Sequence, residues 1–196
     1  MRKSFCSLIS FLLFSLLACG AASAHWYVAP TGNDANNGSK RKPLKTIAAA
    51  LQRVNPGDTV FLREGSYGEF VVPTRSGKPG KMITLKSYPG EIAKIDGSDL
   101  YIKGWGNALV QVNNIDYMQF ENLHICHAHD SENNTDPEGI YITGTSGNIT
   151  FRGCKVYDIK NDCPLVDAKG DWRSAHAILV LGTDDNTPIR NLLIEK

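Results

Sequence analysis

Most of the chain alternates short apolar runs with turn residues, and one segment near the amino terminus follows a different period. From residue 46 to residue 54, apolar side chains recur three or four positions apart, which is the spacing of one helical face. These side chains are Ile47, Ala50, Leu51 and Val54. A Pro-Gly pair at positions 56 and 57 would end a helix. The pattern predicts one short amphipathic helix over residues 46–53.

The later runs have the two-residue period of β-strands. They begin at Thr59, Phe70, Met82, Ala108, Met118, Gly139, Asn148, Ala177 and Asn191. Turn residues are frequent between them, because the chain has 18 glycines and 9 prolines. The chain is therefore predicted to be all-β with a single helix.

The strand-like runs also repeat one another. Residues 138–144 align with residues 176–182, and more loosely with a segment that ends at Val112. A second set of aligned strands begins at Met118, Ile149 and Leu192. Because strand order is constant and only the loops differ in length, the repeats predict a parallel β-solenoid, in which each coil buries its inward residues against the next. A β-sandwich or jelly roll is the alternative, but neither requires matching registers.

Several stretches carry a family resemblance. YVAPTGNDANNGS from Tyr27, PLKTIAAALQRVNPGDTVFLREGSYGE from Pro43 and NITFRGCKVYDI from Asn148 resemble secreted right-handed parallel β-helix proteins of the family nine pectate lyase type. More distant relatives of this kind include chondroitinase B and alginate lyases. The resemblance covers essentially residues 25–196, and it implies that the short helix caps the open end of the first coil. Ile47, Leu51 and Val54 offer the apolar cover that such an end needs.

The carboxyl end shows no comparable cap. Residues 191–196 repeat a strand, and neither an amphipathic segment nor a polar final coil follows them. An uncovered apolar cross-section is costly. We therefore expect residues 25–196 to be the amino-terminal cap and first coils of a parallel β-helix domain, apparently truncated at the carboxyl end.

The first 24 residues have the pattern of a secretory signal peptide. Arg2 and Lys3 precede an apolar stretch from residue 5 to residue 18, and the small-residue site Ala-Ser-Ala ends at position 24. Cleavage there would release a protein that begins at His25, outside the cytoplasm, in the periplasm or the medium. The segment around Cys19 also resembles a bacterial lipobox, so a lipoprotein anchored through Cys19 is the alternative. The apolar stretch is too short for a membrane span.

The composition limits the classes of protein to which this chain can belong. Hydrophobic residues make up 42% of the chain and charged residues 21%, with a formal net charge of +1. These values exclude a disordered tail, a multi-pass membrane protein and a basic nucleic-acid binder. The histidines at 124, 127 and 129 match no known metal-ligand spacing and are predicted to be surface residues.

Two carboxylate-rich loops, residues 127–138 and 158–176, lead into aligned strands. Alignment places Glu138 and His176 at equivalent positions of successive coils. Oxygen-rich loops on one edge suit Ca²⁺ better than a transition metal, although solvated loops are the simpler alternative. The predicted calcium ligands are Asp130, Asp136, Glu138, Asp162 and Asp167.

The resemblance implies β-elimination on an acidic, uronate-containing polysaccharide, with Ca²⁺ neutralising the uronate carboxylate and a basic residue removing a proton. No motif here matches the family's catalytic lysine or calcium-binding aspartates. The candidate catalytic residues are Lys160, Arg173 and His176. Lys160 or Arg173 would contact a sugar carboxylate, and Tyr141 would stack against a sugar ring. We thus expect a calcium-dependent lyase, monomeric at full length. A glycoside hydrolase on the same fold and a non-catalytic carbohydrate-binding or adhesion solenoid are the alternatives.

Overall fold

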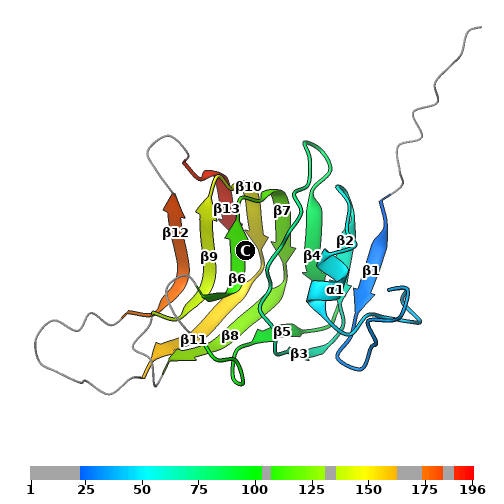
Figure 1. Ribbon diagram of the computed structural model, residues 1–196, viewed down its shortest axis with the longest axis horizontal. Helices are drawn as coiled ribbons and strands as arrows, with labels where there is room; N and C mark the ends of the chain where they lie inside the picture. Colours follow the sequence, from blue (N-terminus) through cyan, green and yellow to red (C-terminus); the bar gives the residue numbers. More distant parts are fainter. Residues whose placement is uncertain (1–22, 103–106, 131–135, 163–173, 183–187) are drawn as a thin grey trace, which may run out of the picture.

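The computed structural model describes residues 23–102, 107–130, 136–162, 174–182 and 188–196. In this part of the chain, thirteen strands wrap around a common axis into a parallel β-helix (Figure 1). The predicted signal peptide lies outside the described residues except for Ser23 and Ala24. In the described ranges no helix is long and apolar enough to cross a membrane.

Three parallel sheets run along the axis. The six-stranded sheet has the order β1 (His25–Val28), β2 (Thr59–Leu62), β4 (Ile83–Ser87), β7 (Asp116–Glu121), β10 (Gly147–Arg152) and β13 (Arg190–Glu195). The four-stranded sheet, along the lower side of Figure 1, has the order β11 (Lys155–Asn161), β8 (Leu123–Asp130), β5 (Ala93–Asp96) and β3 (Gly65–Tyr67). The three-stranded sheet has the order β12 (His176–Gly182), β9 (Glu138–Gly144) and β6 (Ala108–Asn113).

The pairing registers confirm the predicted repeats. Ile140 of β9 pairs with Val110 on one side and Ile178 on the other. Ile149 of β10 pairs in the same way with Met118 and Leu192. From β6 onward, successive coils therefore supply strands to the three sheets in the same order, as a solenoid requires, and the sandwich alternative is wrong.

Some strand predictions were wrong or incomplete. The run from Phe70 forms only an isolated bridge between Val71 and Val110. Pro73 lies two residues further on and has no N–H to donate to a longer ladder. Three short strands, β1, β3 and β5, had not been predicted from the sequence.

Stacked apolar side chains fill the interior. Leu85, Phe120 and Phe151 occupy one register position in successive coils and are at most 1% exposed. The rings of Phe120 and Phe151 are parallel, with centroids 4.5 Å apart. Such in-register stacking explains why the same residue types recur at the same position of each repeat.

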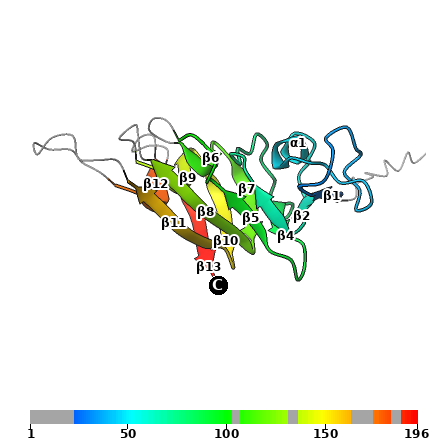
Figure 2. The same cartoon turned by 90° about the horizontal axis from the view of Figure 1, so that it is seen from below.

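The predicted helix is present but shorter than its pattern. α1 spans Ile47–Leu51, and its N-cap Thr46 accepts a hydrogen bond from the backbone N–H of Ala49. The Glu69 carboxylate accepts two more, from the N–H groups of Ile47 and Ala48. Ile47, Leu51 and Val54 are buried, and α1 lies at the same end of the solenoid as β1 and β2 (Figure 2).

At the other end, the last coil is more exposed than the coils before it. Ile194 of β13 is 54% exposed, whereas Phe151, its neighbour in register, is 1% exposed. A ladder of outward ion pairs reaches this coil, because Arg152 contacts Glu195 at 2.5 Å and Glu121 at 3.4 Å. Exposed pairs of this kind contribute little to stability.

Candidate functional site

The two carboxylate-rich loops leave the four-stranded sheet and enter the three-stranded sheet on the same side of the solenoid. One connects β8 to β9, and the other connects β11 to β12. Their ends are in register, because Asn161 pairs with Asp130 and His176 pairs with Glu138. We call the described polar residues at these ends the loop corner. It consists of Asp130, Asp136, Glu138, Asp162 and His176.

Glu138 and His176 are the centre of the loop corner. Their adjacency in successive coils confirms the alignment made from the sequence. By the two-residue period, Glu138 shares the inward face of Ile140 and Ile142, and it is only 1% exposed. Its Oε2 atom and the Nδ1 atom of His176 are buried, and neither has a hydrogen-bond partner among the residues that the structure describes. Buried polar atoms without protein partners are rare, and they are explained by an ordered water, a bound ion or ligand, local strain or a catalytic role.

The electrostatics of Glu138 differ from those of an ordinary surface carboxyl. Burial, and next the nearby carboxylate of Asp136, raise the pKa of Glu138 to about 7. Asp136 is held in place, because its Oδ1 accepts a hydrogen bond from the Ser174 N–H at 3.0 Å. Glu138 can therefore both carry and release a proton near neutral pH.

Asp130 is the last residue of β8, and Asp162 directly follows the last residue of β11. The N–H of Asp162 donates to the carbonyl oxygen of Asp130 at 2.7 Å. Asp130 is 2% exposed, whereas the Asp162 side chain is 55% exposed. The other two site predictions in these loops, Asp167 and Arg173, lie outside the described residues.

Lys160 lies on β11, close to the loop corner. Its ammonium contacts the carboxylate of Asp158, and this hydrogen bond raises the pKa of the Lys160 ammonium above its ordinary value. A lysine that keeps its proton suits carboxylate binding better than proton abstraction.

Tyr141 lies away from the loop corner, in the middle of β9. It is half-buried and pairs in register with Gln111 and Leu179, on the face opposite to Ile140 and Ile142. Its stacking against a sugar remains a prediction.

Sequence reasoning missed the partners of two histidines. His127 and His129 are at the surface, as predicted, with side chains 33% and 40% exposed. Each nevertheless lies near carboxylates, His127 beside Asp96 and both beside Asp158. The pairing of β5, β8 and β11 brings these residues together. The sequence could not reveal this pairing, because β5 had not been predicted.

Carboxylate oxygens of the kind found at the loop corner suit a hard divalent cation, since Ca²⁺ takes oxygen ligands. Asp136 lies near Glu138, and a cation there would relieve the repulsion between the two carboxylates. Among the described residues, however, no three ligand atoms of the loop corner lie close enough together to hold an ion. A calcium ion at Asp136 would therefore need further ligands.

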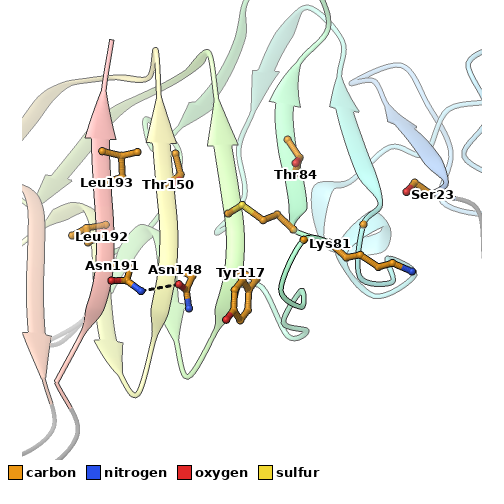
Figure 3. Close-up of a pocket in the computed structure, with 12 residues that line it drawn as sticks. Ser23, Lys81, Thr84, Tyr117, Asn148, Thr150, Asn191, Leu192 and Leu193 are labelled. Carbon is orange, nitrogen blue, oxygen red and sulfur yellow. Dashed lines mark hydrogen bonds between the residues drawn. The ribbon is translucent and has the colours of Figure 1, made fainter. Parts of the chain in front are cut away.

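A separate depression of about 760 Å³ lies on the six-stranded sheet (Figure 3). Tyr117, Asn148 and Asn191 form one row across β7, β10 and β13, and the Asn191 amide donates to Asn148 Oδ1 at 2.9 Å. Thr150 and Leu193 lie beside that row. No carboxylate is among the lining residues, so this surface offers hydroxyls, amides and the ammonium of Lys81 rather than acid–base groups.

Comparisons with known proteins agree with this fold. The family described as "Pel9A-like, right handed beta helix region" matches residues 26–185. The chain is 32% identical over 144 residues to YwoF, an uncharacterised protein of Bacillus subtilis, covering 74% of this chain and 31% of that protein. It is 26% identical over 147 residues to pectate lyase PEL9 of Emericella nidulans, covering 69% of this chain and 34% of that enzyme. The chain thus spans about a third of the length of these relatives.

Among solved structures, a GH136 lacto-N-biosidase from Eubacterium ramulus superposes with a TM-score of 0.60 at 18% identity. The match covers 88% of this chain and 34% of that protein. At this identity the likeness concerns the fold.

Proposed function

Since this chain belongs to the Pel9A-like right-handed β-helix family, we propose that it works as a secreted polysaccharide lyase that cleaves an acidic, uronate-containing polysaccharide with the help of Ca²⁺. In this proposal, residues 1–24 are the signal peptide and residues 25–196 belong to the exported β-helix. The similarity to a pectate lyase over 69% of the chain supports the substrate class. The observation that carries the proposal is the loop corner, where Glu138 and His176 bring unpaired buried polar atoms together.

The reaction requires three contributions from the protein. The uronate carboxylate must be held, the proton beside it must be removed, and the departing glycosidic oxygen must receive a proton as the carbon–oxygen bond breaks and the double bond forms. Lys160 carries the positive charge that holds a carboxylate. Glu138 and His176 are the groups placed to move protons, since one has its pKa near neutrality and the other has an unpaired ring nitrogen. Calcium held by Asp136 would add charge neutralisation of the uronate.

One observation favours a glycoside hydrolase as the second candidate. Such enzymes use a pair of carboxyl groups, one of which has a raised pKa and acts as the acid. Asp136 and Glu138 have these properties, because the charge of Asp136 contributes to the raised pKa of Glu138. The product separates the two reactions, since hydrolysis leaves no double bond.

The first test is therefore product analysis with polygalacturonate. In the presence of calcium, the full-length protein should release products with unsaturated ends, which are detected by their ultraviolet absorbance, together with new reducing ends. Glu138→Gln should lower turnover about 10²-fold or more, the usual contribution of a general acid or base. Glu64→Gln, which removes an exposed carboxylate in the first coil, is the control and should retain full turnover.

Three results would contradict the proposal. Reducing ends without absorbance would show a hydrolase, and retention of polysaccharide without cleavage would show a binding module. Full activity in Glu138→Gln would exclude this residue from the reaction.

A further inference from the structure

A cysteine, a histidine and an aspartate come together on the four-stranded sheet, away from the loop corner. They are Asp96 on β5, and Cys126 and His127 on β8, two strands that are neighbours in that sheet. Each of the three residues places one ligand atom within 4.8 Å of those of the other two. The proposed lyase chemistry uses none of them. We call this group the cysteine–histidine site.

The strand register and one backbone irregularity bring these side chains together. Asp96 pairs with Cys126, and the residues before them, Ile95 and Ile125, are fully buried in the interior. By the two-residue period, Asp96 and Cys126 therefore share the opposite, outward face of the sheet. Regular alternation would turn His127 inward, but its φ of 60° lies in the left-handed region and interrupts the alternation. Its ring lies instead beside Asp96, with Nδ1 2.9 Å from Oδ1.

The separations are close to those of ligands that share one ion. Nitrogen and oxygen ligands at about 2.0–2.1 Å from a tetrahedral zinc ion lie about 3.3 Å apart, and a sulfur at about 2.3 Å lies about 3.6 Å from either. The Asp96 carboxylate and the His127 ring would therefore separate by a few tenths of an Å on binding. The Cys126 sulfur would approach by about 1 Å, which a small rotation about its Cα–Cβ bond supplies.

Neighbouring groups support each of the three ligands. The Tyr157 hydroxyl is a hydrogen-bond partner of the Cys126 sulfur, and such a partner stabilises a metal-bound thiolate. The Ser98 hydroxyl donates to Oδ1 of Asp96 at 2.6 Å and orients that carboxylate. On the far side of the His127 ring, Nε2 lies 3.6 Å from Oδ2 of Asp158. A carboxylate behind the second ring nitrogen is typical of metal-bound histidines.

The exposure of the three residues suits a metal better than a reactive thiol. Cys126 is fully buried, and burial raises the pKa of its thiol, so a free thiolate is disfavoured. The side chains of His127 and Asp96 are 33% and 19% exposed. An ion can therefore reach the site from solvent along the ring and the carboxylate, with the sulfur at its inner end.

We propose that Asp96, Cys126 and His127 bind one divalent transition metal ion of the zinc type, which fastens β5 to β8. Thiolate and imidazole ligands select such an ion over calcium, which takes oxygen ligands. On binding, the Cys126 thiol releases its proton to solvent, and the ring proton of His127 moves from Nδ1 to Nε2. Three protein ligands leave the fourth tetrahedral position to a water molecule. The site shares no residue with the loop corner.

Cobalt(II) titration of the full-length protein tests this site, because a cobalt–thiolate bond gives a charge-transfer band in the near ultraviolet. The wild type should bind cobalt and show this band, and zinc should displace the cobalt and remove it. Cys126→Ser should lose the band and weaken zinc binding by more than the about 10- to 100-fold that loss of a supporting residue costs. Asp96→Asn should keep the band, because the thiolate remains, and bind zinc about tenfold more weakly or worse.

Two variants serve as matched controls. Cys154 is the other described free cysteine, and its sulfur contacts the carbonyl oxygen of Phe120 at 3.5 Å. His124 lies on the same strand as Cys126, and its Nδ1 faces the Tyr157 hydroxyl at 3.4 Å. Cys154→Ser and His124→Ala should both keep the band and the zinc affinity of the wild type.

Anomalous diffraction at the zinc edge provides a readout that needs no variant, and it should place the ion within bonding distance of the Cys126 sulfur. Absence of saturable cobalt and zinc binding, a band that survives in Cys126→Ser, loss of the band in Cys154→Ser, or an ion located elsewhere would overturn the proposal. Glu138→Gln should lower lyase turnover and leave zinc affinity unchanged, so the two proposals can fail separately.

Discussion

Phe120→Ala should lower the free energy of unfolding of the full-length protein by about 3–5 kcal/mol, the usual cost of removing a buried aromatic side chain. Phe120 is fully buried and lies between Leu85 and Phe151 in the stack of successive coils. The smaller side chain would remove the parallel ring contact at 4.5 Å and leave a cavity inside the solenoid. Denaturant unfolding measures the loss, and hydrogen exchange of β7 and β10 amides should locate it.

Ile92→Ala is the control for this substitution. Ile92 directly precedes β5, away from the carboxyl end, and it is 49% exposed. Its replacement should cost less than about 1 kcal/mol, as is usual for exposed positions. Equal losses in the two variants would contradict the assignment of the interior.

The second large effect concerns Glu138 and pH. Its pKa is about 7 in the folded protein and 4.5 in an ordinary environment, so between these values the folded state holds a proton that the unfolded state has released. Stability contributed by this group is fully present below pH 4.5 and is lost as the pH rises through about 7. At 1.36 kcal/mol per pKa unit, the loss amounts to about 3 kcal/mol.

Unfolding of the wild type and Glu138→Gln, measured in chelator from about pH 5 to about pH 8, isolates this contribution. The glutamine variant should become more stable relative to the wild type by about 2.5 kcal/mol across that range. Saturating calcium should reduce the difference, because the ion stabilises the charged carboxylate. A constant difference at all pH values would show that Glu138 titrates like an exposed glutamate.

The architecture could be predicted from the sequence because stacking enforces register. Gln119 and Thr150 align in the sequence for the same reason that they pair in the structure, since any slip would turn apolar residues toward solvent. The same reasoning placed Glu138 beside His176. The unpaired Oε2 of Glu138 and Nδ1 of His176 could not be predicted, because the hydrogen bonds of single atoms depend on side-chain geometry that the sequence pattern does not contain.

The contacts of His127 and His129 with Asp96 and Asp158 show the limit of sequence patterns. His127 and Asp158 adopt left-handed backbone conformations, so the two-residue alternation fails at both. Asp96 ends a four-residue strand that leaves almost no periodic signal. Spacing along the chain therefore indicated isolated surface histidines, whereas pairing between coils joins them to carboxylates.

Calcium titration of wild type and Asp136→Asn, followed by turnover of polygalacturonate at each calcium concentration, tests the central claim that the loop corner is the functional site. Asp136 lies near Glu138, and its N–H partner Ser174 can also bond an asparagine oxygen, so the fold should persist. The variant should bind calcium at least tenfold more weakly, and its turnover should require correspondingly more calcium. Unchanged calcium affinity and unchanged turnover in Asp136→Asn would contradict the account and place the chemistry elsewhere in the protein.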